Sequence, residues 1–313
     1  MNYQISHITT YEYNETVATC QNVVHLAPRA VLRQTCHQHR LLVRPTPTLI
    51  NRRTDYFGNP VSYFSISEGH RKLSITSMCR VDVRPSPLTM TTESIAWEMV
   101  RDALPADRGA HSVNNYQFCF DSPHIAGSNE LAAYAASTFG PGRPILEGVI
   151  ELTARIHKDF TYDTQATTVH TPLAEVFAHR RGVCQDLAHV QIGCLRSLGL
   201  AARYVSGYLR TLPPPGRPRL VGADASHAWV AVFCGPLGWI DVDPTNNALV
   251  DTHHVTISWG RDYSDVCPIN GVFVGGGAHV MTVSADVEPL DDDLAGTTAS
   301  MSLTAQNDKR EKK

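Results

Sequence analysis

Three polar residues in the second half of the chain have the types and the order of a nucleophilic triad. Cys184 follows "RRGV", His227 lies in "ASHAWVAVF", and Asp243 lies in "GWIDVDPTNN". A thiolate nucleophile needs a base that can also protonate the leaving group, and that base needs a partner that orients it. The three residues therefore predict acyl transfer through a cysteine, a histidine and an aspartate.

The position of Cys184 suits a reactive thiol. The stretch "CQDLAHVQIGCLRSLGL" has apolar residues at a spacing near 3.6 and ends at Gly199, which predicts a helix that begins near Cys184. Backbone N–H groups at a helix start lack internal partners, and the helix dipole adds partial positive charge there, so a thiolate is favoured over a thiol. Gly182 is expected to let the backbone approach a bound substrate.

Other polar residues of this helix have simpler interpretations. Cys194 shares the apolar stripe of Leu187 and Leu198 and is predicted to be a core residue. Asp186, in the first turn, suits the positive end of the helix dipole. His189 lies on another face of the helix than Cys184 and is expected to be structural.

The third member of the triad depends on how two strands pair. Residues two apart on a strand share a face, which groups His227 with Trp229 and Asp241 with Asp243. If the strands pair through "CGPLG", a count outward from residue 235 sets His227 opposite Asp243 and Asp241 opposite Trp229. We therefore prefer Asp243, with Asp241 as the alternative.

The elements that would hold these residues are of two kinds. Residues 1–88 alternate between apolar and polar as strands do, for example in "KLSITSMCRVDV", and predict a small all-β, sandwich-like domain. Residues 89–145 change to helical patterns and form a connecting region. The remaining core, residues 146–290, places helices before antiparallel strands, which is an α+β arrangement. Residues 291–313 are polar and are expected to form a disordered tail.

Composition excludes several classes of protein. A net charge of −3 argues against nucleic acid or an anionic membrane as a partner, and no apolar run reaches the length of a membrane span. The first residues lack the pattern of a signal peptide, so a cytoplasmic location with reduced thiols is expected for the eight cysteines. No cofactor, zinc pair or calcium loop is expected, and the adjacent His253 and His254 are interpreted as surface residues.

Together these blocks resemble the bacterial transglutaminase-like superfamily. The resemblance is carried by "GVCQDLAHVQIGCLRSLGLAARYVSGY", "ASHAWVAVF" and "GWIDVDPTNN", and before them by "YQISHITTYEYN", "HLAPRA" and "DYFGNPV"; "GRDYSDVCPINGV" follows the core. It implies a papain-like core with an N-terminal β domain, and it implies Cys184 as nucleophile, His227 as base and acid, and Asp243 as the residue that orients the imidazole.

The resemblance leaves the acyl acceptor open. Cys184 would attack a carboxamide or peptide carbonyl of a peptide, a protein or a γ-glutamyl amide and form a thioester. Water as acceptor gives an amidase or cysteine peptidase, which we favour because no sequence feature marks an amine site. Crosslinking to an amine is the alternative, and a non-catalytic peptide-binding module is a second alternative.

Contacts to the substrate are expected from three further residues. The backbone N–H of Cys184 is one candidate donor to the oxyanion. Tyr162 in "FTYD", Gln185 and Trp229 are assigned as oxyanion or substrate-binding residues. The sequence does not indicate an oligomeric state.

Overall fold

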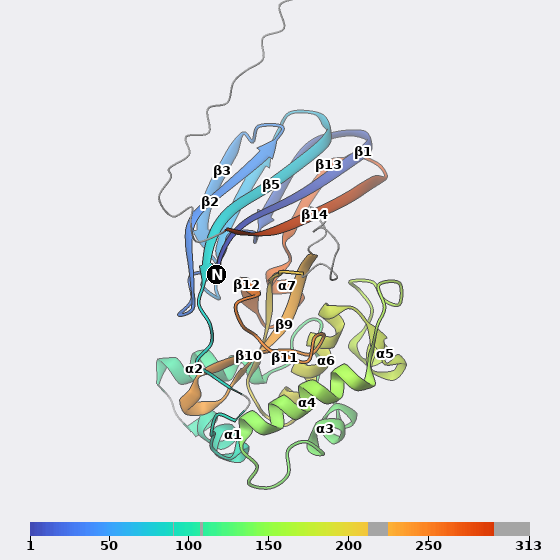
Figure 1. The fold of residues 1–313 in the computed structure, drawn as a ribbon. Coiled ribbons are helices and arrows are strands. Elements are labelled where there is room, and N and C mark those ends of the chain that lie inside the picture. The colour runs from blue at the N-terminus through green and yellow to red at the C-terminus, as the bar shows by residue number, and fades with distance from the viewer. Residues whose placement is uncertain (90, 107–108, 212–224, 291–313) are drawn as a thin grey trace, which may run out of the picture.

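A single long strand, β1 (Asn2–Val24), organises the N-terminal part of the molecule. The computed structural model describes residues 1–89, 91–106, 109–211 and 225–290 (Figure 1), so the tail predicted for 291–313 lies outside the described residues. The sheet has the order β2-β5-β1-β4-β3, formed with β2 (Gln34–Arg44), β3 (Leu49–Thr54), β4 (Pro60–Ile66) and β5 (His70–Val83). One half of β1 pairs with β5 and the other with β4, which curls the sheet.

The alternation in the sequence accounts for the core of this sheet. Every second residue of β5 from Leu73 to Val83 is buried, as the pattern "KLSITSMCRVDV" predicts. Leu73 and Ile75 join apolar residues of β1 and β4 inside the curl. Cys79, Val81 and Val83 pack instead in a cluster that reaches the second sheet. The strand β3 was not predicted, because all of its residues are exposed and the segment carries no apolar alternation.

The last strands of the described chain return to this first sheet. The strands β13 (Ile269–Gly275) and β14 (His279–Leu290) both pair antiparallel with β1. The predicted boundary of the core at residue 290 is therefore wrong, because residues from Ile269 onward complete the N-terminal domain. Strand pairing between segments far apart in the chain leaves no local signal in either segment.

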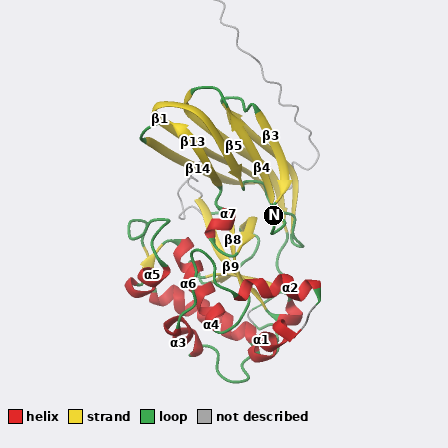
Figure 2. Cartoon of the chain, turned by 180° about the vertical axis from the view of Figure 1, so that it is seen from behind, coloured by secondary structure: helices red, strands yellow, loops and turns green. Residues whose placement is uncertain are grey.

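The second domain packs helices against one face of a five-stranded sheet (Figure 2). The sheet order is β11-β10-β9-β8-β12, with β8 (Ala202–Leu209), β9 (Ala225–Phe233), β10 (Trp239–Asp243), β11 (Ala248–Leu249) and β12 (His254–Gly260). The helices are α1 (Trp97–Ala106), α2 (Ala110–Tyr116), α3 (Asn129–Ala136), α4 (Ile145–Asp159), α5 (Leu173–His179), α6 (Cys184–Ser197) and α7 (Tyr263–Val266).

Helix α6 is the centre of this domain. Ten of its residues from Leu187 onward are buried, and the apolar ones join the core that α3, α4, β9 and β10 complete. Because α3 shares this core, the segment predicted as a connecting region belongs to the second domain. The fold is α+β, as expected, and among the described residues no helix is long and apolar enough to cross a membrane.

Two amide side chains fasten the N-terminal domain to β12. Gln34 donates to the carbonyl of Thr256 (2.7 Å) and accepts from its N–H (2.8 Å). Asn59 likewise donates to the carbonyl of Trp259 (2.8 Å) and accepts from its N–H (3.0 Å). Each amide thereby satisfies backbone groups that an edge strand would otherwise leave unpaired.

Arg196 anchors α6 to the surrounding loops. Its guanidinium is buried and donates to the carbonyls of Phe118, Ala202 and Arg261 and to the hydroxyl of Ser122. We predict that Arg196→Met lowers the free energy of unfolding by about 3 kcal/mol or more, since each buried acceptor left unpaired costs about 1–3 kcal/mol.

Urea unfolding followed by circular dichroism measures this loss. The exposed residue Arg40 on β2 provides the matched control, and Arg40→Met is expected to stay within about 0.5 kcal/mol of the wild type. Equal stability of the two variants would contradict the anchoring role of Arg196.

Candidate active site

The carboxylate of Asp243 is the centre of a hydrogen-bonded cluster at the end of β10. Its Oδ2 accepts from His227 Nε2 (2.8 Å), His254 Nε2 (3.1 Å) and Asn246 Nδ2 (2.7 Å). Its Oδ1 accepts from the N–H groups of Thr245 (2.9 Å) and Asn246 (3.2 Å). Asp243 is 0% exposed, so these donors replace the water that a charged carboxylate requires.

Cys184 is the first residue of α6, as the sequence predicts. The ring of His227 is hydrogen-bonded to Asp243 and lies close enough to Cys184 for the thiol to help raise the pKa of the imidazole. Because Nε2 of His227 is bonded to Asp243, Nδ1 is the ring nitrogen left for Cys184. The structure therefore brings the three predicted triad residues together in the order thiol, imidazole, carboxylate.

The charges of this cluster are set by the hydrogen bonds rather than by burial. Burial alone would lower the pKa of His227, but the hydrogen bond to Asp243 and the charges of Asp243 and Cys184 raise it to about 10. Burial would likewise raise the pKa of Asp243, but the hydrogen bonds from His227, His254 and Asn246 hold it well below its usual range. At neutral pH the pair is thus an imidazolium and a carboxylate.

The register that joins β9 and β10 differs from the predicted one. The observed partners are Trp239 with Phe233 and Asp241 with Ala231, so Asp241 is not opposite Trp229. His227 is therefore a diagonal rather than a direct neighbour of Asp243. The count failed because the connection contains a short 3-10 turn, Gly235–Leu237, which shifts the pairing by two residues.

The alternative third residue, Asp241, does not contact His227. Its Oδ2 accepts from Trp229 Nε1 at 3.4 Å. Asp241 and Asp243 lie on the same face of β10, but Asp241 comes two residues earlier on the strand and is paired with Ala231. Asp243 is therefore the residue whose geometry fits the orienting role.

His254 was expected at the surface, and this prediction is wrong. The side chain is only 6% exposed, and it donates to the same carboxylate oxygen as His227. Asn246 was also missed, although it lies within the triad block "DPTNN". Neither could be assigned from spacing, because His254 reaches Asp243 from β12, a strand that is not adjacent to β10 in the sheet.

The three additional substrate contacts have different outcomes. Tyr162 lies beside Gly182 through the pairing of β6 (Thr161–Tyr162) with β7 (Arg181–Gly182), which sets it close to the start of α6. It is 54% exposed, so it is accessible to a substrate. Gln185 is partly exposed on the first turn of α6. Trp229 is 0% exposed and packs against His254, so it supports the imidazoles and does not line a substrate surface.

The remaining residues near the start of α6 have structural roles. Asp186 folds back to accept from the N–H of Val183 (2.8 Å) and the hydroxyl of Thr167 (2.6 Å). A Cβ on Gly182 would lie 2.5 Å from this carboxylate, so the glycine makes room for Asp186, not for a substrate. Cys194 is fully buried, and burial raises its pKa to about 12, which confirms its role in the core. His189 is buried too and accepts from the N–H of Tyr263.

The same cluster contains a possible set of metal ligands. Nε2 of His227, Nε2 of His254 and an oxygen of Asp243 lie within 4.8 Å of one another. Imidazole nitrogen and carboxylate oxygen are ligands that zinc accepts. Here both nitrogens already donate to Oδ2, so a metal ion would have to replace both hydrogen bonds and displace the protons that they use.

Comparison with known proteins agrees with this geometry. The model of the bacterial transglutaminase-like N-terminal region matches residues 3–82, and the model of the transglutaminase-like superfamily matches residues 132–244. The uncharacterized protein Rv2569c of Mycobacterium tuberculosis is 41% identical over 296 residues, which cover 93% of this chain and 94% of that protein. The chain belongs to the transglutaminase-like superfamily.

Two further matches extend over nearly the whole chain. The uncharacterized protein ML0607 of Mycobacterium leprae is 29% identical over 92% of this chain and 98% of its own length. A solved structure from Cytophaga hutchinsonii, described as a candidate cysteine protease, has the same fold with a TM-score of 0.70 and 22% identity, covering 93% of this chain and 92% of that one.

One match is to a relative with a named activity. A protein-glutamine gamma-glutamyltransferase of Pseudomonas aeruginosa is 33% identical over 102 residues, which cover 30% of this chain and 15% of that protein. The likeness is thus limited to a minor part of each chain.

Replacing Asp243 tests which carboxylate controls the imidazole in this transglutaminase-like protein. Asp243→Asn keeps the shape of the side chain but removes its charge, so the lowering effect of burial on His227 becomes dominant. We predict that the pKa of His227 then falls from about 10 to below its ordinary value of 6.5. Nitrogen-15 NMR of the imidazole ring as a function of pH measures the change.

Asp241→Asn is the matched control, because Asp241 is on the same strand but does not contact His227. It is expected to leave the pKa of His227 unchanged. An unchanged pKa in the Asp243 variant, or an equal fall in both variants, would contradict the assignment of Asp243.

Proposed function

We propose that this protein is a thiol-dependent hydrolase that cleaves a carboxamide or peptide bond through a thioester on Cys184. The observation that carries the proposal is the imidazole of His227, which interacts electrostatically with Cys184 and is hydrogen-bonded to the buried carboxylate of Asp243. This is the relation of nucleophile, base and orienting group that acyl transfer requires.

In the first half of the reaction, Cys184 is the nucleophile and His227 is the acid. The thiolate of Cys184 adds to the carbonyl carbon of the amide, and the carbonyl oxygen becomes an oxyanion. The imidazolium of His227 then transfers its proton to the leaving nitrogen, the carbon–nitrogen bond breaks, and a free amine and a thioester remain. The backbone N–H of Cys184 at the start of α6 is positioned as an oxyanion donor, with Tyr162 as a second candidate.

The second half requires a neutral imidazole. Acylation of the sulfur removes the negative partner of His227, which lowers the pKa of the ring and lets it act as a base. The ring takes a proton from water as the oxygen adds to the thioester. The carbon–sulfur bond then breaks, which releases a carboxylic acid and restores the thiolate–imidazolium pair.

Water access favours hydrolysis over transfer to an amine. Tyr162 beside the start of α6 is 54% exposed, and Ser226 next to His227 is exposed as well. Transfer to an amine is the second candidate, and its support is the partial match to the Pseudomonas gamma-glutamyltransferase. The natural substrate that we propose is a peptide, a protein or a γ-glutamyl amide.

A glutamine peptide incubated with a labelled primary amine separates the two reactions. We predict that the wild type releases ammonia and the glutamate peptide faster than it incorporates the amine. Cys184→Ala is expected to lose at least about 10³-fold in rate, since removal of the nucleophile leaves only binding and oxyanion stabilisation. Mass spectrometry of the peptide measures both products.

Cys194→Ala serves as the control, because that thiol is buried in the core and makes no contact with His227. It is expected to retain activity when it is folded. Incorporation that outruns hydrolysis would identify an acyltransferase, and a Cys184→Ala protein as active as the wild type would exclude both reactions.

The pH dependence follows from the raised pKa of His227. The ring stays protonated below a pH of about 10 in the free enzyme, so the proton that it delivers to the leaving nitrogen is held through neutral pH. We predict that kcat/KM for an amide substrate is retained above pH 7 and falls as the pH rises through about 10. A profile that falls near pH 6.5 instead would show that Asp243 does not hold the proton on His227.

A further inference from the structure

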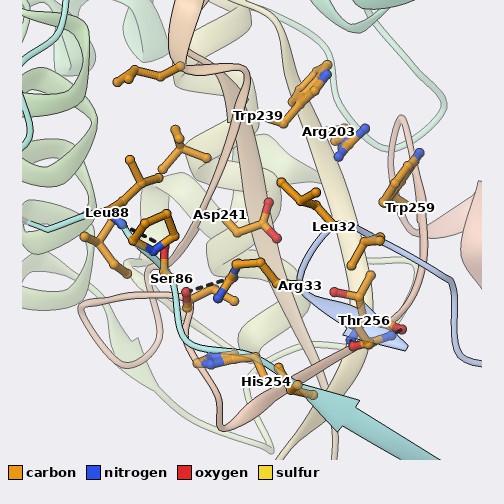
Figure 3. Close-up of a pocket in the computed structure, with 18 of the residues that line it drawn as sticks. Leu32, Arg33, Ser86, Leu88, Arg203, Trp239, Asp241, His254, Thr256 and Trp259 are labelled. Atoms are coloured by element: carbon orange, nitrogen blue, oxygen red, sulfur yellow. Dashed lines mark hydrogen bonds between the residues drawn. The ribbon is translucent and has the colours of Figure 1, made fainter. Parts of the chain in front are cut away.

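A cavity lies between the two domains, and Cys184 is not among the residues that line it. It has a volume of about 410 Å³, within the range of about 300–1,000 Å³ that is usual for small-molecule sites. Its walls come from both domains (Figure 3): Leu32 and Arg33 before β2, Leu88 after β5, Arg203 on β8, Asp241 on β10, and His254 and Trp259 on β12.

The carboxylate of Asp241 is the acidic group of this cavity. Figure 3 shows it directed into the space between Arg33 and Arg203. Its one recorded hydrogen bond, from Trp229, is long at 3.4 Å. The residue is half-buried, so its carboxylate is accessible from the cavity that it lines. A ligand that carries a positive group would supply what this carboxylate lacks.

Two basic residues line the cavity, Arg33 and Arg203. The guanidinium of Arg33 already donates to the carbonyls of Arg84 and Val250, so Arg203 is the one considered for a ligand. Its guanidinium is stacked between two indoles, 3.7 Å from the ring of Trp259 and 4.2 Å from that of Trp239. The residue is 9% exposed, and its Nε has no hydrogen-bond partner. Stacking covers the faces of the guanidinium and leaves its donor edge for an acceptor.

The two charged groups attract each other but do not meet. Arg203 contributes a favourable electrostatic interaction with Asp241, yet among the described residues no direct ion pair joins them. Opposite charges that line one cavity without a direct ion pair can both be paired by a molecule that carries a donor for one and an acceptor for the other. Such a molecule carries an ammonium and a carboxylate, and the walls around it are leucines and tryptophans.

We propose that this cavity binds an α-amino acid with an apolar side chain, whose ammonium pairs with Asp241 and whose carboxylate pairs with Arg203. The site also borders the triad, because His254 lines the cavity and donates to the carboxylate of Asp243. Nδ1 of His254 is buried without a partner. A bound amino acid therefore lies one side chain away from the residue that orients His227.

Binding is tested with L-leucine and two analogues that each lack one charge. The Cys184→Ala protein is titrated by calorimetry with L-leucine, N-acetyl-L-leucine and L-leucinamide. L-leucine is expected to bind saturably, and each analogue at least about tenfold more weakly, because a charged hydrogen-bonding partner is lost. This variant cannot form a thioester, so the result does not depend on the proposed hydrolysis.

Two variants locate the site. Asp241→Asn and Arg203→Lys are each expected to weaken L-leucine binding at least about tenfold. Asp102→Asn, an exposed carboxylate on α1, is the matched control and is expected to leave the affinity unchanged. Absence of saturable L-leucine binding, or equal affinity for the three compounds, would overturn the proposal.

Fluorine NMR provides a measurement that does not rely on the folding of a cavity variant. The chain has four tryptophans, and two of them, Trp239 and Trp259, line the cavity, whereas Trp97 lies on α1. In protein labelled with 5-fluorotryptophan, L-leucine is expected to shift the signals of Trp239 and Trp259 and not that of Trp97. Saturable binding that leaves both cavity signals unchanged would place the ligand elsewhere and overturn the proposal.

Discussion

The five hydrogen bonds to Asp243 are the constraint on which the rest of the site depends. A carboxylate with no exposure to water can stay charged only if donors replace its hydration, and here they come from β9, β12 and the turn after β10. The charge that they preserve holds the proton on His227. His227 in turn contacts Cys184 at the start of α6, so one buried anion links the central sheet to the central helix.

The second imidazole gives Asp243 a fixed position. With three donors on Oδ2 and the turn N–H groups on Oδ1, the carboxylate is held against rotation away from His227. His254 is therefore a positioning residue that acts through Asp243. Its own place depends on β12, whose backbone is held by Gln34 and Asn59 of the N-terminal domain. The N-terminal domain thereby supports the triad from a distance, which gives it a physical role besides any contact with substrate.

The local parts of this structure could be predicted from the sequence because each has a local physical cause. The alternation in β5 determines which face is buried, and the 3.6-residue spacing together with Gly199 determines α6 and its start at Cys184. The same helical stripe separates the reactive Cys184 from Cys194 in the core. The blocks around Cys184, His227 and Asp243 were sufficient to indicate the superfamily and the order of the triad.

The sequence could not determine the contacts between distant segments. The register of β9 and β10 depends on the shape of one turn, and a shift by two residues keeps every side chain on its face, so alternation cannot detect it. The return of β13 and β14 to β1, and the approach of His254 to Asp243, arise from packing of segments with no common local pattern. The sequence by itself determined most of the elements and the candidate nucleophile at the start of α6, because both follow from neighbouring residues. Only the tertiary structure decided which carboxylate receives two imidazoles and where the two domains leave a charged cavity, because both depend on atoms brought together across the chain.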